Sequence, residues 1–248
     1  MIDSCFFNSV NNGTATATAT VTVTATSYTN IGSFYIHHDK PHYTVSHVSD
    51  NGMNHPMYQL LYQSFQTRIP DIAQFIYNKK SVVPLSNIIC DASMISFSLD
   101  IVNLLFQSMY SQICFLLKHG VAISFIDITD IMVINGNSFY FCNYDKLYHI
   151  KNGFITITDF YDLQNHFLPP ELINNNIIPF TTYYTSSFYS LAIIILYCFK
   201  KISLLEGGVE EHDLSYKTLL NMYQHTKIYF TLKYCLVKEP TKRSLHMF

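Results

Sequence analysis

Charged residues are scarce in this 248-residue chain: they make up 13% of it, tryptophan is missing, and glycine and proline occur eight times each. A hydrophobic content of 49% argues against wholesale disorder, and the length suits one compact unit or two small lobes that share a cleft. The 15 Lys and Arg residues are scattered and the formal net charge is -2, so the sequence lacks the basic stripe typical of nucleic-acid binding. We therefore expect no nucleic-acid partner.

Closely spaced metal or disulfide motifs are also missing. The six cysteines are far apart, with no C-x-x-C pair, and none of the eleven histidines lies in an H-E-x-x-H pattern. We expect free thiols, no metal site and a reducing, cytoplasmic location, because no signal peptide is visible. The longest apolar segment, Phe188 to Phe199, has about a dozen residues against the roughly 20 of a spanning helix, so we expect no membrane span.

Asn, Ile, Tyr and Phe are abundant instead. This bias resembles coding bias toward A and T, which occurs in some large DNA viruses and some protists; for a viral source the expected location is the host cytoplasm. Tyr and Phe occur 19 times each, a content that favours core packing and a sticky protein interface.

Short extended segments around one helix are predicted for residues 1–88. Between Gly13 and Ser27, Thr alternates with Ala or Val, which is the period of a strand. A disordered low-complexity tract is the alternative there, and disorder is also open for residues 1–12. The later patterns predict two strands, at 33–37 and 43–48, and a helix at 57–66 that is opened by Asn54 and Pro56. They also predict a hairpin in which 75–77 pairs with 82–85.

From residue 89 to residue 248 the pattern is mainly helical. Apolar residues recur at helical spacing from Ile101 to Leu116, and Lys118-His119-Gly120 predicts the end of that helix. Asn135-Gly136 predicts a turn between two short strands, 132–134 and 138–142, and Ser186 or Ser187 caps a later apolar helix. The predicted class is α+β: a small β-rich part, 1–88, followed by a larger, mainly helical part, 89–248.

Five segments between Gly120 and Arg243 resemble, in order, motifs of the protein kinase family. The segment from Gly120 to Val133 resembles the approach to the catalytic loop and the loop itself, H-R-D-L-x-x-x-N, and Asn143-Tyr144-Asp145 stands where D-F-G follows. The other three resemble the A-P-E segment, the start of the central buried helix and the closing C-L-x-x-D-P-x-x-R: Leu168 to Leu172, Ser187 to Ala192, and Cys235 to Arg243. The resemblance implies a two-lobed protein-kinase-like fold with a β-rich N-lobe and a helical C-lobe.

The groups that transfer phosphate in that family are missing at the matched positions. The alignment puts Phe125 at the catalytic Asp, Asp130 at the metal-binding Asn and Asn143 at the Asp of D-F-G. Phe125 cannot orient a hydroxyl, no Glu precedes Glu171 to pair with a strand lysine, and no G-x-G-x-x-G occurs. The resemblance therefore implies a degenerate member, a pseudokinase, with no catalytic, cofactor-binding or metal-binding residues expected.

A second register keeps an enzymatic alternative open. It places Phe125-Ile126-Asp127 on H-R-D, which makes Asp127 the base and leaves Met132 at the Asn position. The chain is then a divergent Ser/Thr protein kinase that uses Asp127 or Asp130 with Asp145, and ATP and Mg²⁺ are its cofactors. The three carboxylates are also typical of loop residues that only hydrogen-bond nearby backbone.

The scaffold of the family is retained at Glu171 and Arg243. The Glu of A-P-E pairs with the Arg of the closing motif in kinases, so we predict a direct, largely buried Glu171–Arg243 ion pair. A retained scaffold without its chemistry favours a protein-binding or assembly module with a protein partner. A structural viral protein with kinase ancestry only is the remaining alternative.

Overall fold

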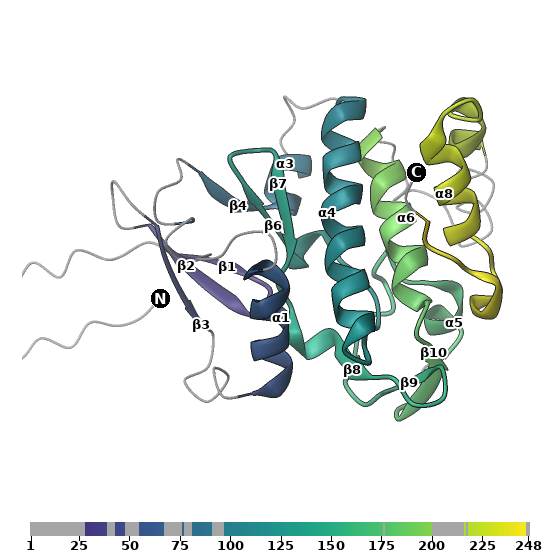
Figure 1. Ribbon diagram of the computed structural model, residues 1–248, viewed down its shortest axis with the longest axis horizontal. Helices are drawn as coiled ribbons and strands as arrows, with labels where there is room; N and C mark the ends of the chain where they lie inside the picture. Colours follow the sequence, from purple (N-terminus) through teal and green to yellow (C-terminus); the bar gives the residue numbers. More distant parts are fainter. Residues whose placement is uncertain are drawn as a thin grey trace, which may run out of the picture.

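The computed structural model describes residues 28–38, 43–47, 55–66, 76, 81–90, 97–175, 177–199, 216 and 218–246. These residues form a mixed α/β structure of small antiparallel sheets and several helices. In Figure 1 the N-terminal strands lie on the left, the two longest helices stand side by side in the middle, and the last helix lies on the right. The predicted strand at 13–27 and residues 1–12 lie outside the described residues.

The first sheet is a three-stranded antiparallel meander of β1 (Tyr28–Ile31), β2 (Phe34–His37) and β3 (Thr44–His47). The strands predicted at 33–37 and 43–48 are confirmed, whereas the sequence does not anticipate β1, in which Asn30 interrupts the apolar alternation. Ile31 and Phe34 pair across the β1–β2 turn, and Gly32 there has a φ of +55°. A positive φ at this first turn position requires glycine in a two-residue hairpin of type II′.

Helix α1 (Pro56–Gln66) begins at the predicted proline. An N–H group in the first turn of a helix has no acceptor within that helix, so proline, which has none, suits this position. The N–H of the next residue, Met57, donates to Nδ1 of His55 at 3.2 Å. Met57, Leu61 and Phe65 form its buried face. The predicted start and end of this helix are confirmed, although Asn54 lies outside the described residues.

The predicted hairpin of 75–77 with 82–85 is wrong: Ile76, the described residue of its first segment, is helical, and its second segment has another partner. β4 (Val82–Pro84) pairs instead with β6 (Ile131–Ile134), and β6 also pairs with β7 (Ser138–Phe141). All four β6 residues are buried, and pairing on both edges satisfies the backbone groups of such a strand. Sequence-local reasoning missed a partner about fifty residues away.

The expected boundary after residue 88 falls inside helix α3 (Leu85–Cys90), directly after β4. β4, which precedes residue 88, lies in one sheet with β6 and β7, which follow it, so this three-stranded sheet crosses the expected boundary. β1, β2 and β3 form a separate sheet.

Helix α4 (Leu99–Lys118) follows its sequence prediction closely. Ser98 caps its start by accepting a hydrogen bond from the N–H of Ile101, and after Lys118 the chain turns at Gly120, whose φ is +70°. α4 packs against α6 (Ser186–Phe199), and α8 (Lys227–Cys235) packs on α6 (Figure 1).

The remaining elements are short. β5 (Val121–Ile123) pairs with β8 (Leu147–His149), and β9 (Phe154–Ile157) pairs with β10 (Phe180–Tyr183). α5 (Pro170–Ile173) and three 3-10 turns complete the described fold: η2 (Ile128–Asp130), η3 (Tyr144–Lys146) and η4 (Pro240–Lys242). Within the described ranges, no helix combines the length and the apolar character needed to cross a membrane.

Candidate functional site

The candidate site lies where η2 and η3 flank the β6–β7 hairpin. Asn135 and Gly136 make the predicted turn of this hairpin, with φ values of 51° and 75°. The other end of β7 is fixed by Gln112 on α4. Its Oε1 accepts from the N–H of Phe141 at 2.9 Å, and its Nε2 donates to the Phe141 carbonyl at 3.0 Å and to Ser64 Oγ at 2.9 Å. This buried amide ties α1, α4 and β7 together two residues before Asn143.

Phe125 is a core residue. Its exposed fraction is 5%, and it packs with five buried apolar side chains: Ala122, Ile155, Ile157, Leu168 and Leu172. The Tyr161 ring meets it edge-on, with 5.9 Å between ring centroids. A benzyl group in this environment cannot accept a proton or orient a hydroxyl, so the position matched to the catalytic Asp is used for packing.

Asp130 is the one carboxylate enclosed in the site, with an exposed fraction of 3%. Asn143 Nδ2 donates to its Oδ1 at 2.8 Å, the Asp127 N–H donates to its Oδ2 at 3.2 Å, and the Lys146 ammonium forms an ion pair with Oδ2. Burial raises the pKa of Asp130, while the Lys146 ammonium and the Asn143 hydrogen bond act in the opposite direction. Asp130 and Asn143, predicted from the motif spacing, are thus brought together.

Lys146 is the residue that sequence reasoning missed. Its Nζ lies 3.9 Å from the centre of the Phe125 ring while it contacts Asp130, so the cation sits between a carboxylate and an aromatic face. A signal for it exists: Lys146 is the only lysine between Lys118 and Lys151, a stretch in which a buried Asp needs a counter-charge.

Asp127 serves the loop itself. Its Oδ1 accepts from the N–H and the Oγ1 of Thr129, at 2.7 and 2.6 Å, and its Oδ2 accepts from the Asn165 side-chain amide. Asp127 therefore caps η2, and the loop-carboxylate interpretation is confirmed for it. In Asp127, which the second register makes the catalytic base, both carboxylate oxygens accept hydrogen bonds.

Asp145 is an exposed residue of η3, and its backbone N–H donates to Asn143 Oδ1 at 3.1 Å. Asn143 thereby caps η3 with its oxygen and holds Asp130 with its nitrogen.

The β1–β2 turn lies directly on the end of β7. The Ser33 N–H donates to the Cys142 carbonyl at 2.8 Å, and Ser33 Oγ accepts from the Tyr144 N–H at 3.0 Å. A Cβ atom on Gly32 would lie 2.7 Å from the Cys142 oxygen, so only glycine allows this approach. The N-terminal sheet is thus anchored at the position matched to D-F-G.

The predicted Glu171–Arg243 ion pair is present. Arg243 Nη1 and Nη2 donate to Glu171 Oε1 and Oε2 at 2.5 and 2.7 Å, a bidentate arrangement, and the side chains are 0% and 12% exposed. Arg243 Nε donates to the Val237 carbonyl at 2.7 Å, and the guanidinium lies 4.9 Å from the Tyr189 ring centre. Every part of this guanidinium is engaged in linking α5 to the chain after α8.

Known proteins give no family for this arrangement: no protein-family model matches the chain, and no curated protein matches it. In the part of the chain that the structure describes, no group of three or more His, Cys, Asp or Glu side chains is placed to hold a metal ion.

Proposed function

We propose that this chain is a catalytically inactive protein with a two-lobed, protein-kinase-like fold, and that it acts as a protein-binding or assembly module in the cytoplasm. The order of elements supports the fold proposal. A long helix, a loop with a carboxylate, a hairpin, the Asn143 turn, the Pro170–Ile173 helix and a buried helix follow one another as the motifs do. In α6 every side chain except that of Tyr197 is buried, which suits the central helix of the larger lobe.

The observation that carries the functional proposal is the Lys146 ion pair beneath a buried Phe125. Phosphoryl transfer needs a carboxylate at the reacting hydroxyl and metal ions held by further acidic groups. Phe125 fills the first position with hydrocarbon, and the Lys146 ammonium already neutralises Asp130, the acidic group matched to a metal ligand. Both positions therefore stabilise the fold.

The β1–β2 turn supports weak or absent nucleotide binding. A kinase covers the phosphates with a glycine-rich loop that stands away from the larger lobe. Here the turn contains one glycine and bonds directly to Cys142 and Tyr144. The turn thus lies against the residues on both sides of Asn143, and the exposed apolar side chains Phe160 and Ile177 favour a protein partner.

The experiment is a phosphate-transfer assay on the purified chain with labelled ATP and Mg²⁺, alone and with a generic substrate, alongside a thermal-shift titration with the same nucleotide. We expect transfer at background, and a melting temperature that changes by less than about 1 °C at millimolar ATP, since a ligand stabilises only the state that it binds.

If phosphate transfer is above background, two variants test whether it comes from the divergent kinase site of the enzymatic alternative. The enzymatic alternative would be established if Asp127→Asn or Asp130→Asn abolished phosphate transfer while Asp162→Asn left it unchanged. Asp162 is the matched control because it is an exposed loop carboxylate that accepts a backbone N–H, that of Gln164 at 2.9 Å, away from Asp130.

A further inference from the structure

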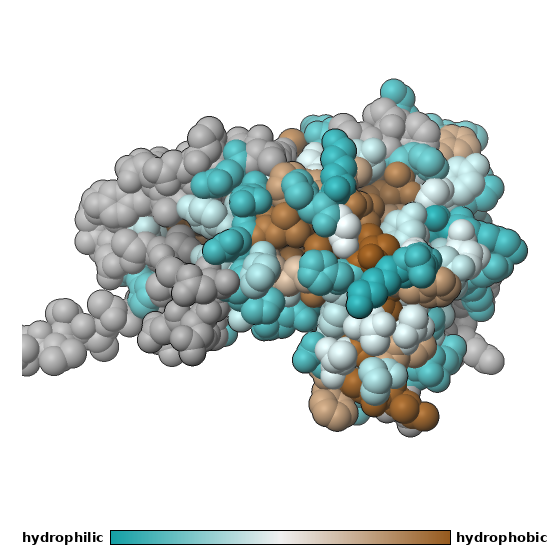
Figure 2. Space-filling model, turned by 60° about the horizontal axis from the view of Figure 1, so that its bottom comes forward, coloured by the Kyte–Doolittle hydropathy of each residue, from teal (hydrophilic) through white to brown (hydrophobic). Residues whose placement is uncertain are grey.

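Three apolar side chains are exposed where the chain leaves β9 and where it enters β10. The exposed fractions of Phe160, Leu163 and Ile177 are 93%, 45% and 73%. Ile157 pairs with Phe180 at this end of the ladder, so Phe160 and Ile177 each stand three residues beyond the last pair. Hydrophobic side chains reach the surface at this lower part of the molecule, where Figure 1 places β9 and β10 (Figure 2).

Tyr161 holds the two segments together. Its hydroxyl contacts the carbonyl oxygens of Leu172 and Asn175, at 3.2 and 2.9 Å, and its ring packs on Phe125. These contacts anchor the chain directly beside Phe160.

Two carboxylates lie beside this apolar group. Asp159 and Asp162 are exposed, and residues 158–165 contain no basic side chain. Asp159 Oδ2 accepts from the Tyr148 hydroxyl at 2.8 Å, which fixes its position. We call the surface formed by Asp159, Phe160, Asp162, Leu163 and Ile177 the acidic knob.

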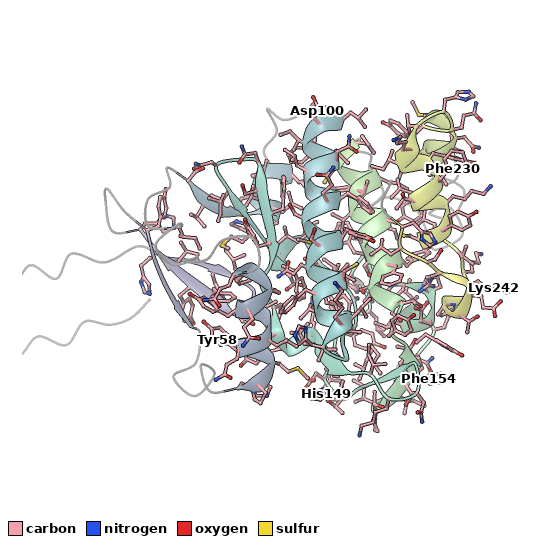
Figure 3. All side chains as sticks on the ribbon, in the orientation of Figure 1. Tyr58, Asp100, His149, Phe154, Phe230 and Lys242 are labelled. Carbon is pink, nitrogen blue, oxygen red and sulfur yellow. The ribbon has the colours of Figure 1, made fainter. Side chains whose placement is uncertain are left out.

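The outer face of α8 has the opposite charge and similar chemistry. Phe230 and Tyr234 are 48% and 47% exposed, Lys227 and Lys233 are exposed beside them, and α8 contains no acidic residue. The spacing of three and four residues puts these side chains on one face of the helix, while Ile228 and Leu232 face inward. α8 is the outermost helix, with Phe230 labelled on it in Figure 3. We call Lys227, Phe230, Lys233 and Tyr234 the α8 face.

We propose that the α8 face of one copy binds the acidic knob of a second copy. The inference rests on the assembly role proposed above and names its partner as the same chain. Each surface offers aromatic groups flanked by charges of one sign, and the signs are complementary. Because the two surfaces are different, the contact is head-to-tail: it forms open chains, which leave one surface of each kind unused at the ends, or a closed ring.

The test is sedimentation velocity of the full chain between about 5 and about 200 µM, a range suited to the weak affinity of a small interface. We expect species larger than a monomer that grow with concentration and decrease in 0.5 M NaCl, a salt level at which the Debye length falls to roughly 4 Å. Phe160→Ser and Phe230→Ser each weaken association at least about tenfold, the loss expected when a central aromatic is truncated. Leu99→Ser, at a 46% exposed apolar residue outside both surfaces, leaves association unchanged.

Charge reversal identifies the pairing. Lys227→Glu/Lys233→Glu and Asp162→Lys are each expected to be monomeric, and an equimolar mixture of the two variants is expected to associate again. The proposal is overturned if the protein is a monomer at every concentration, if Phe160→Ser leaves association unchanged, or if the mixture stays monomeric. So does tight binding of a labelled single-stranded 20-mer through Lys227 and Lys233, which would make the α8 face a nucleic-acid surface. Phosphate transfer on the same samples reports separately on the proposed lack of activity.

Discussion

Lys146 makes the buried charge of Asp130 tolerable. An ionised carboxylate with an exposed fraction of 3% loses most of its hydration, and only a counter-charge and hydrogen bonds compensate for that loss. The ammonium, the Asn143 amide and the Asp127 N–H supply them. The same contacts position η2 and η3, so one ion pair organises both turns of the candidate site.

Lys146→Met is expected to lower the free energy of unfolding by roughly 2–4 kcal/mol, because it leaves Asp130 without a counter-charge. The loss is smaller than that from breaking a fully buried ion pair, since the lysine side chain is 18% exposed. Urea denaturation followed by circular dichroism measures the change. The double variant Lys146→Met/Asp130→Asn is expected to regain much of the loss, as no bare charge remains. Lys242→Met serves as control, since that lysine is 70% exposed in its pair with Glu239; equal effects of the two lysine variants would contradict this role.

At the level of single residues, the sequence predicted the chemical role of a side chain better than it predicted which residue the side chain contacts. The lack of a catalytic role at Phe125 is predicted from its side chain alone and stays a prediction, while its burial in an apolar cluster is what the structure adds. The role of Lys146 was not predicted, because its contact with Asp130 spans 16 residues and depends on how η3 turns back toward η2. Asp127 shows the reverse case, since its cap of Thr129 is local and follows from the chemistry of Asp in turns.

Among the elements, the long helices, the tight turn and the strands of local hairpins were predictable, whereas strand pairing across long loops was not. α4 has a cap, an apolar period and a glycine stop within one stretch, and Asn135-Gly136 specifies its hairpin locally. β4 has three residues and pairs with β6, and β5 pairs with β8, across loops whose closure no local pattern encodes. The hairpin predicted for 82–85 was wrong for this reason.

Arg243 links elements that are 72 residues apart in sequence, α5 and the segment after α8. Arg243→Met is expected to lower the free energy of unfolding by roughly 3–5 kcal/mol, because Glu171 and the Val237 and Lys238 carbonyls lose their donors in a buried site. Arg243→Lys is expected to recover only part of this, since an ammonium cannot donate to both carboxylate oxygens in parallel. Urea denaturation compares them, with Glu239→Gln at an exposed carboxylate as control. A lysine variant as stable as the wild type would show that the bidentate geometry contributes nothing.

For the molecule as a whole, one turn joins the N-terminal sheet to the candidate site. Ser33 hydrogen-bonds the backbone on both sides of Asn143, and α1 adds aromatic contacts through Tyr58, whose ring lies 6.1 Å from that of Tyr144. An α+β class was predicted from composition and periodicity, and the described residues form small antiparallel sheets and several helices. The position of the β1–β2 turn was not predicted, because the constraint on Gly32 is the backbone of Cys142, 110 residues away.

Gly32→Ala therefore tests how the N-terminal sheet is held. Its φ of +55° makes any side chain strained, and the added Cβ would also lie 2.7 Å from the Cys142 oxygen. Gly136→Ala is the matched control, because its φ is +75° and nothing lies within 4 Å of the added Cβ. Both variants bear the left-handed strain of about 1–2 kcal/mol, and only Gly32→Ala displaces the turn.

Hydrogen exchange followed by mass spectrometry distinguishes the two effects. We expect Gly32→Ala to speed exchange in β1, β2 and the Tyr144 amide, whose acceptor is Ser33 Oγ, while α4 and α6 keep their protection. Gly136→Ala is expected to change exchange only in the β6–β7 hairpin. Equal exchange at Tyr144 in the two variants would mean that the turn does not anchor the sheet. Loss of protection throughout α4 in Gly32→Ala would instead mean that the two parts unfold as one cooperative unit.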